Sequence, residues 1–377
     1  MKTNLNNRGD MQIFKHFKLY KIFFAAISFL SPCINSLDAC TGIKLSAKDG
    51  SIVHGRTLEF GIKIDSSVVV VPREFEFTGT TSKGPGLKYK TKYGSVGVMA
   101  FDNPALMDGL NEKGLAVGTF YFPGFAGYTP VTAENQSIAL SPVEFPNWIL
   151  TQFATIDEVK ENLSKVIIAP TVVQQWGPAP APFHYIVFDK DGKSLVIEPR
   201  DGKLLTYDNP LGTFTNSPNF DWHMTNLRNY INLTTLNAKP LKVDGLTFES
   251  FGQGSGLVGL PGDFTPPSRF VRAAIFSITA TPSANADEGV AQAFHILNQF
   301  DIPVGAAQEK VGNVVYSDYT QVTCVRDPQS LKYYFKTYDD QNIKLVDLSS
   351  FDLNAKSLKS ANTSGSQAYT NISAQLK

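Results

Sequence analysis

The sequence has little cysteine and no surplus of charge of either sign. Its 377 residues include 3 cysteines, and 34 basic residues balance 34 acidic ones. So few cysteines cannot build a disulfide framework. A neutral chain also has no electrostatic attraction for nucleic acid or other polyanions. We therefore expect no nucleic-acid partner, and a fold held by a hydrophobic core, for which a 42% hydrophobic composition is sufficient.

The motifs of several common catalytic classes are also missing. Four of the five histidines, at positions 54, 184, 223 and 295, are scattered, and neither HExxH nor CxxC occurs, so the sequence predicts no metal site. The glycine-rich segment 252–263 lacks the Gly-Lys-Ser/Thr end of a phosphate-binding loop and is interpreted as a turn. The G-x-S-x-G turn of serine hydrolases is absent as well. We expect neither a metal nor an organic cofactor.

Long apolar runs are absent, and the N-terminus has the pattern of a targeting segment. Lys15, Lys18 and Lys21 precede a short apolar run at 22–30, and a polar stretch then ends at Ala39. This pattern is typical of a secretory signal, whereas a membrane helix needs about 20 apolar residues. We predict that residues 1–39 are a removed signal peptide, with Met1 or Met11 as the start. The mature protein would then be exported, to the periplasm or outside the cell, with no membrane segment left.

The rest of the chain alternates strand-like and helix-like segments. Asp-Gly turns near positions 49, 191 and 201 predict antiparallel hairpins. Strands are predicted at 40–46, 51–58, 66–72, 94–101, 114–122, 184–189, 194–199, 203–208, 318–327 and 330–339, and helical patterns at 147–164, 266–278 and 286–300. Antiparallel sheets with helices on their outer faces follow, in an α+β fold. We predict one domain over residues 40–355 and a polar, frayed tail over 356–377.

Cys40 would be the first residue of the mature chain, and the residues allow several interpretations of it. A cut after Ala39 would give Cys40 an α-amine with an intrinsic pKa of about 7.7–8.0. That amine can take the proton of the thiol on the same residue and activate it as a nucleophile. The "LDAC" sequence also partly fits a lipid-attachment site, and a dyad with a histidine at 54, 184 or 223 is a third option. The residues alone favour the amine-assisted nucleophile only slightly over the lipid anchor. Cys324 is interpreted as a small buried residue rather than as a disulfide partner.

Five segments, in order along the chain, resemble one enzyme family. They are "CTGIKLSAKDGSIVHGRTLEF", "DGLNEKGLAVGTFYFPG", "YDNPLGTFTNSPNFDW", "GLPGDFTPPSRFVRA" and "YTQVTC". The chain is similar to the choloylglycine hydrolase and penicillin V acylase family of N-terminal-nucleophile amidases, from residue 40 to about 350. The resemblance implies a four-layer αββα sandwich of two antiparallel sheets flanked by helices. It also implies hydrolysis of linear amides through a cysteine nucleophile and a homotetrameric assembly.

The resemblance assigns roles to individual residues. Cys40 matches the nucleophile, and Arg56 matches the arginine beside its thiol. Asn216 matches an asparagine whose amide donates to the oxyanion. Arg269 matches a second active-site arginine, whereas Arg272 is expected to be structural.

Two positions depart from the family pattern. Glu59 stands where the family commonly has an aspartate that binds the α-amine. Strict strand alternation puts Arg56 and Glu59 on opposite faces, so the two are expected to share a site only if the strand ends or bends near Leu58. Tyr121 stands where bile-salt-cleaving members often have asparagine, and the acylase branch uses the backbone N–H at this position for the oxyanion. This residue is expected to affect substrate choice more than chemistry.

The substrate is expected to be a small N-acyl amide bound in an apolar, aromatic pocket. Phe60, Phe122, Phe125 and Tyr128 are predicted to line this pocket together with Tyr121. Tyr121 favours penicillin V or an N-acyl-homoserine lactone, while the motifs as a whole favour conjugated bile salts. The alternative from another class is an exported lipoprotein, anchored at Cys40, that binds ligands without cleaving them.

Overall fold

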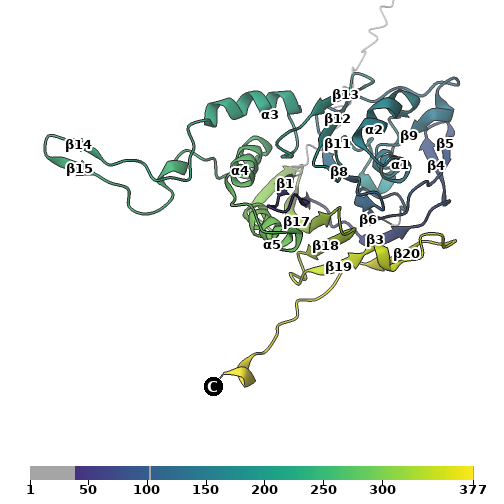
Figure 1. The fold of residues 1–377 in the computed structure, drawn as a ribbon. Helices are drawn as coiled ribbons and strands as arrows, with labels where there is room; N and C mark the ends of the chain where they lie inside the picture. The colour runs from purple at the N-terminus through teal and green to yellow at the C-terminus, as the bar shows by residue number, and fades with distance from the viewer. Residues whose placement is uncertain (1–38, 102, 377) are drawn as a thin grey trace, which may run out of the picture. The chain divides into compact units, whose positions relative to one another are not determined.

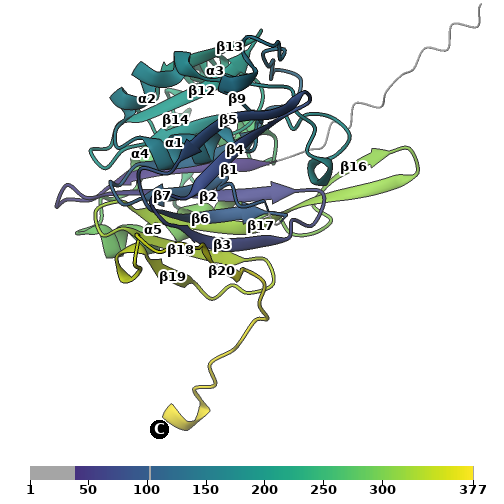
Figure 2. The same ribbon diagram turned by 90° about the vertical axis from the view of Figure 1, so that its right-hand side faces the viewer.

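The computed structural model describes residues 39–101 and 103–376; the predicted signal peptide, apart from Ala39, lies outside the described residues. One antiparallel sheet has the strand order β1-β2-β17-β18-β19, with β16 added beside β17 (Figures 1 and 2). Its strands are β1 (Cys40–Ser46), β2 (Ile52–Phe60), β16 (Ala307–Val311), β17 (Val314–Asp327), β18 (Lys332–Thr337) and β19 (Lys344–Asp347).

The second antiparallel sheet has eight strands in the order β13-β12-β11-β8-β7-β6-β3-β20. Its strands are β3 (Ser66–Val71), β6 (Ser95–Ala100), β7 (Asp108–Asn111), β8 (Ala116–Tyr121), β11 (Phe183–Phe188), β12 (Ser194–Arg200), β13 (Lys203–Asp208) and β20 (Lys359–Asn362). Three two-stranded pairs lie outside the two large sheets: β4 (Glu76–Thr81) with β5 (Gly84–Lys90), β9 (Ala139–Leu140) with β10 (Ile167–Ile168), and β14 (Leu241–Val243) with β15 (Leu246–Phe248).

Helices cover the outer face of each sheet. Figure 1 shows α4 and α5 beside β1 and β17, and α1 and α2 on the opposite side beside β8 and β11. The helices are α1 (Phe145–Gln152), α2 (Ile156–Asn162), α3 (Phe220–Leu227), α4 (Pro266–Thr279) and α5 (Ala286–Leu297). Short 3-10 turns occur at Gln136–Ile138, Leu163–Lys165, Gln174–Trp176, Arg228–Tyr230, Ser255–Leu257, Asn298–Phe300, Leu348–Ser350 and Ser373–Gln375.

Three hydrophobic clusters correspond to the three interfaces between these four layers. Ile149 of α1 and Val117 of β8 belong to the cluster under the first helix layer. Phe120 of β8 and Tyr333 of β18 belong to the cluster between the two sheets. Leu297 of α5 lies in the third cluster, against β1 and β2. The predicted αββα sandwich is therefore confirmed.

The predicted Asp-Gly hairpins form for the expected conformational reason. Asp201 and Gly202 both adopt positive φ, at 50° and 71°, in the two-residue loop between β12 and β13. That combination belongs to the type I′ turn, whose twist matches antiparallel strands. Gly50 and Gly192, at φ 87° and 84°, end the turns of the other two hairpins. The local chemistry of these turns thus sets the register of the adjoining strands.

Some elements differ from the sequence-based expectation. The helical block at 147–164 is two helices, because Thr155 adopts an extended backbone and caps α2 by accepting a hydrogen bond from the Glu158 N–H. Helix α3 and the strands β4, β5, β7, β9, β10, β14, β15, β16, β19 and β20 were not predicted. Part of the tail that was expected to be frayed is ordered, since β20 pairs with β3 and the Thr363 hydroxyl lies 2.6 Å from that of Ser66.

Strands β6 and β7 approach each other unusually closely at a pair of glycines. Gly97 lies opposite Gly109. Asp108, the residue before Gly109, points its side chain into the space between the sheets. A Cβ added at Gly97 would overlap the carbonyl oxygen of Asp108 and lie 2.7 Å from the Cα of Gly109. Only glycine therefore permits this strand spacing.

We expect Gly97→Ala to destabilise the fold by about 3 kcal/mol, because the new methyl group forces two paired strands apart. Gly252→Ala is the matched control, since nothing lies within 4 Å of a Cβ there, and it should change stability by about 0.5 kcal/mol or less. Urea unfolding of both variants measures the difference. Equal midpoints for the two would contradict this account of the β6–β7 contact.

Candidate active site

Cys40 opens strand β1 and is buried, with 4% of its surface exposed. It lies opposite Leu58 of β2, and its side chain belongs to the core between the two sheets. A thiol attached to a lipid would have to leave this core. The burial of Cys40 therefore contradicts the lipid-anchor alternative.

A short backbone bridge brings Asn216 to Cys40. Gly42 and Phe214 exchange two hydrogen bonds, at 2.7 and 3.1 Å, in an antiparallel bridge outside the named strands. In antiparallel pairing each step along one chain matches a step back along the other, so Cys40 falls opposite Asn216. The Cys40 N–H donates to Asn216 Oδ1 at 2.7 Å, and Asn216 Nδ2 donates to the Tyr121 carbonyl at 2.9 Å. One amide N–H bond of Asn216 is thus used within the protein, and the second is available to a ligand.

Arg269 projects from the first turn of α4 and binds the same group of atoms. Its Nη1 donates to the Cys40 carbonyl and, at 2.9 Å, to Thr41 Oγ1. Its Nη2 donates to Asn216 Oδ1 at 2.7 Å. Burial lowers the pKa of Arg269 to about 10, which still leaves it cationic at neutral pH. Arg272 instead bonds carbonyls in the loop before α4, as its expected structural role requires.

Arg56 and Glu59 approach Cys40 from opposite faces of β2. Arg56 Nη1 donates to the Thr119 carbonyl of β8 at 2.5 Å, whereas Glu59 Oε1 accepts from Thr320 Oγ1 of β17 at 2.7 Å. The β2–β17 pairing shifts register between Thr320 and Val322, next to Leu58, where the sequence required an irregularity. The side chains of β2 nevertheless keep alternating between its two faces. Arg56 and Glu59 reach one site because Cys40 lies at the end of β1.

The charges around Cys40 have opposing effects on its thiol. Burial raises the pKa of Cys40, and the Arg56 guanidinium opposes that rise most strongly. The Glu59 carboxyl raises this pKa further, while the Glu59 backbone N–H and Arg269 lower it. Arg56 is therefore the main group that favours the thiolate.

Two buried carboxyl groups lie on the helix side of the site. Burial raises the pKa of Glu59 to about 8, although Arg269 and Thr320 oppose the rise. Burial and the neighbouring Glu309 raise the pKa of Asp318 to about 7. Glu59 Oε2 and Asp318 Oδ2 have no hydrogen-bond partner among the described residues. Glu59, which acts on the Cys40 thiol, can therefore accept a hydrogen bond from a cation beside Cys40, whereas Asp318 acts on Arg269.

An aromatic cluster stands beside the site. The Phe60 ring meets the rings of Tyr121 and Trp176 edge-on, with centroids 6.0 and 5.4 Å apart. Trp176 also contacts Phe101 and Phe183 edge-on. Trp176, which begins a proline-rich loop, thus contacts the predicted pocket residue Phe60. Trp176 itself was not singled out, because nothing local in the sequence shows that it meets Phe60.

The other predicted pocket residues do not join this cluster in the contacts that the structure records. Phe122 is fully buried and stacks on His184, with centroids 4.1 Å apart, and on Phe125, at 5.5 Å. Phe125 is the more exposed of the pair. The Tyr128 hydroxyl is held by the backbone of residues 181–183, at 2.6 and 2.8 Å. Tyr128 thus anchors the start of β11.

Two of the three histidines considered as a base for Cys40 lie within hydrogen-bond distance of backbone carbonyls instead. His184 Nε2 lies 3.0 Å from the Thr215 carbonyl, and His223 Nε2 lies 2.9 Å from the Asn216 carbonyl. Burial lowers the pKa of His223 to about 4 and that of His54 well below its usual value. His184 and His223 therefore support the segment that carries Asn216, and the structure does not favour a Cys–His dyad.

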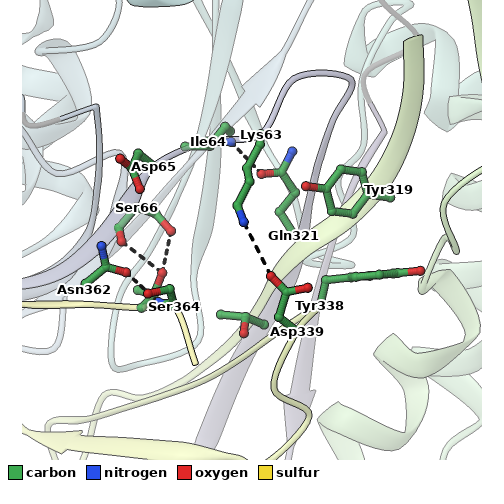
Figure 3. A pocket seen from close by; sticks show the side chains of 12 residues that line it. Lys63, Ile64, Asp65, Ser66, Tyr319, Gln321, Tyr338, Asp339, Asn362 and Ser364 are labelled. Atoms are coloured by element: carbon green, nitrogen blue, oxygen red, sulfur yellow. Dashed lines mark hydrogen bonds and ion pairs between the residues drawn. The ribbon is translucent and has the colours of Figure 1, made fainter. Parts of the chain in front are cut away.

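Gln321 was missed as a site residue, although it lies within one of the motifs that resemble the family. It occupies the register shift of β17, and its Nε2 donates to the carbonyls of Phe60 and Ile62 at 2.9 and 2.8 Å. Its Oε1 accepts from the Ile64 N–H at 2.7 Å (Figure 3). The cavity drawn there holds about 40 Å³, which suits a few water molecules rather than an N-acyl substrate. One amide side chain thus holds the loop that follows Phe60.

No group of three or more His, Cys, Asp or Glu side chains in residues 39–101 and 103–376 is arranged to hold a metal ion. Over the same residues, no helix is long and apolar enough to cross a membrane. Cys40 and Cys324 are both free and buried.

Comparison with known proteins identifies close relatives of this chain. A bile salt hydrolase/transferase from Clostridium perfringens is 32% identical over 322 residues, covering 85% of this chain and 95% of the relative. One from Bifidobacterium longum is 30% identical over 319 residues, covering 85% and 98%. Both relatives are thus matched over nearly their whole length.

Solved structures share the fold. A variant of the conjugated bile acid hydrolase from Clostridium perfringens superposes with a TM-score of 0.78 at 32% identity, covering 88% of this chain and all of that one. A second variant, with a cysteine replaced by alanine, has the same TM-score of 0.78. The first variant has an arginine replaced by leucine, and these two positions are separated there as Cys40 and Arg56 are here. Penicillin V acylase from Agrobacterium tumefaciens, 24% identical over 86% of this chain and 91% of its own, shares the fold with a TM-score of 0.69.

The family match covers residues 40–361 and begins at the buried cysteine. This extent includes every element that contributes to the site described above. The chain therefore belongs to the linear amide C–N hydrolases of the choloylglycine hydrolase family.

Proposed function

We propose that this enzyme is exported, begins at Cys40 in its mature form, and cleaves N-acyl amides with the Cys40 thiol. The observation that carries the proposal is the 2.7 Å hydrogen bond from the Cys40 nitrogen to Asn216 Oδ1, made where Arg269 and Arg56 converge. The same acceptor would hold and orient the free α-amine of the mature chain. Because Ala39 and Cys40 are both buried, the signal peptide would be removed before the chain folds.

The reaction would proceed in two steps at Cys40. The thiol sulfur attacks the amide carbonyl carbon while the α-amine takes the thiol proton, and Arg56 stabilises the developing thiolate. The C–N bond then breaks as the α-ammonium gives that proton to the leaving nitrogen, and a thioester remains. Water, deprotonated by the same amine, hydrolyses the thioester and releases the acid and the thiol. The α-ammonium would be held by Asn216 Oδ1 and by the unpartnered oxygen of Glu59.

The negative oxygen of each tetrahedral intermediate needs donors that are already in place. Asn216 Nδ2 has a second N–H bond available, and the Tyr121 backbone N–H is proposed as its partner donor. Arg269 holds the Asn216 amide in this orientation through Oδ1. No metal or organic cofactor enters these steps.

The acyl group would be apolar and would contact the Phe60–Tyr121–Trp176 cluster. Several relatives are named bile salt or conjugated bile acid hydrolases, and this makes conjugated bile salts the first substrates to test. Penicillin V and N-acyl-homoserine lactones remain the second class, because Tyr121 presents an aromatic side chain to the cluster. Phe125 is proposed as an outer contact, since it is the exposed member of its pair.

Replacing Cys40 with serine should nearly abolish hydrolysis of every N-acyl amide and leave the fold intact, because a hydroxyl is a far weaker nucleophile at neutral pH. A chain that keeps one extra residue before Cys40 should also be inactive, since it lacks the free amine. The measurements are hydrolysis rates, circular dichroism, and mass spectrometry of the N-terminus of protein recovered from the periplasm or medium. Turnover by the serine variant, or a lipid on Cys40, would refute the mechanism.

Tyr121→Asn should change the ratio of kcat/KM between a phenoxyacetyl amide and a glycine-conjugated bile acid by roughly 10–200-fold, because it reshapes the pocket wall. Asn216→Ala should depress both substrates together by ~10²–10³-fold, since each transition state needs the oxyanion donor. Assays of both variants on both substrates separate the two roles. An unchanged ratio for Tyr121→Asn would move specificity to the loops at 60–65 or 174–182.

Homotetramer formation is proposed to depend on an exposed arm. Residues 231–262, which include β14 and β15, reach away from the two sheets (Figure 1). The arm exposes the large apolar side chains of Ile231, Leu236, Leu241, Val243, Leu246, Phe248, Phe251 and Val258. Such a concentration on one projecting segment is typical of a protein–protein contact.

The triple variant Leu241→Asp/Leu246→Asp/Phe248→Asp should therefore lower the mass of the assembly, because three charges cannot be buried in an apolar contact. Light scattering after size-exclusion chromatography measures this mass. Ile343→Asp, an exposed apolar position outside the arm, is the control and should leave the mass unchanged. A tetramer that persists in the triple variant would assign assembly to another surface.

A further inference from the structure

Two arginines and a single carboxylate are buried between the sheets behind Cys40. Arg56 comes from β2, Asp108 from β7 and Arg326 from β17, and their exposed fractions are 1%, 2% and 1%. Cys324 of β17 lies opposite Arg56 in the strand pairing. A buried cluster of this kind is costly unless it serves the fold or the site.

The carboxylate of Asp108 is closer to Arg326 than to Arg56. Its Oδ2 lies 3.3 Å from Arg326 Nη2 and 3.7 Å from Arg56 Nη1. Its Oδ1 accepts hydrogen bonds from the Tyr333 hydroxyl at 2.9 Å and from Cys324 Sγ at 3.2 Å. These two donors fix the carboxylate without adding charge to the cluster.

The neighbouring titratable groups do not alter the charge of this cluster. Burial raises the pKa of Cys324 to about 12 and that of Tyr333 well above its usual value, so both stay protonated. His54 packs nearby, and burial together with Arg326 holds its pKa well below the usual value, so it stays neutral. Two guanidinium groups and one carboxylate therefore leave a single net positive charge.

Within the described residues, Arg56 keeps unused hydrogen-bonding capacity at Nη2, as Arg326 does at Nε. The Arg56 Nε donates to the Thr57 carbonyl at 3.1 Å, and its guanidinium carbon lies 4.2 Å from the centre of the Phe120 ring. Its Nη2 has no hydrogen-bond partner in the part of the chain that the structure describes. Arg56 is also the member of the cluster whose charge acts most strongly on the Cys40 thiol.

We propose that Arg326 is a positioning residue of the active site, which shares Asp108 with Arg56 and so leaves the Arg56 charge only partly compensated beside Cys40. The proposal rests on Cys40 being the nucleophile. Glu59 and Arg269 also face Cys40, from β2 and α4, but neither contacts Asp108 in the recorded interactions. Without Arg326, Arg56 and Asp108 would form a neutral pair, and the thiolate would lose its main stabilising charge.

The mature enzyme with Arg326→Met tests this directly. The thiol of Cys40 should titrate about one pH unit higher than in the parent, and the acid limb of kcat/KM should shift by the same amount. The thiol titration is measured as the rate of iodoacetamide alkylation against pH, with the Cys40 peptide followed by mass spectrometry. Because this readout needs no substrate, it separates failure of the inference from failure of the proposed activity.

Three further variants distinguish charge from packing. Arg326→Lys keeps the charge and should titrate as the parent does. Asp108→Asn, which is nearly isosteric, leaves two uncompensated charges and should shift the thiol titration to lower pH. The double variant Arg326→Met/Asp108→Asn restores one net positive charge and should return the titration to within about half a pH unit of the parent.

Arg73→Met is the matched control, because Arg73 forms an ion pair with Glu112 and is not among the charges that act on Cys40. In this variant the titration of the Cys40 thiol should be unchanged. A parental titration in Arg326→Met would overturn the proposal, as would a double variant that behaves as the single one does. If Arg326→Met fails to fold, Asp108→Asn decides: a shift to lower pH supports the proposal, and an unchanged titration overturns it.

Discussion

The bridge between Gly42 and Phe214 is the contact on which the site depends. Two backbone hydrogen bonds align the segment at 213–216 with the first strand and place Asn216 opposite Cys40. The bridge requires a small residue, because a Cβ on Gly42 would lie 3.0 Å from the Phe120 ring. Arg269, His184 and His223 then bind atoms of the aligned segment and hold it in place.

The second determinant of the site is the removal of charged groups from water. Burial opposes ionisation of Cys40 and Glu59, so the state of each group is decided by its few neighbours rather than by solvent. Two arginines oppose the effect of burial on the Cys40 thiol: Arg56 from the space between the sheets and Arg269 from the helix layer. A four-layer sandwich permits this arrangement, because a strand between two layers can receive side chains from both faces.

The position of the Phe60–Tyr121–Trp176 cluster depends on a different constraint, the hydrogen bonds of Gln321. Gln321 stands where β17 carries an irregular residue, and its amide closes three hydrogen bonds with the loop after β2. Phe60, at the start of that loop, then meets Tyr121 and Trp176. The irregularity in β17 therefore links the end of β2 that lies beside Cys40 to the Phe60–Tyr121–Trp176 cluster, so that the geometry of one depends on the geometry of the other.

The sequence by itself determined the features that depend on neighbours along the chain. Asp-Gly turns predicted hairpins, the Asn285 side chain caps α5 by accepting from the Glu288 N–H, and Cys40 stood out by its place after the apolar segment. The ordered motifs added the family, and with it Arg56, Asn216 and Arg269. The tertiary structure alone decided that Arg56 and Glu59 both act on Cys40, that Trp176 meets Phe60, and that Asp108 forms ion pairs with two arginines. The physical reason is that these contacts join residues far apart along the chain, as Cys40 and Asn216 are separated by 176 positions, and only the packing of the layers brings them together.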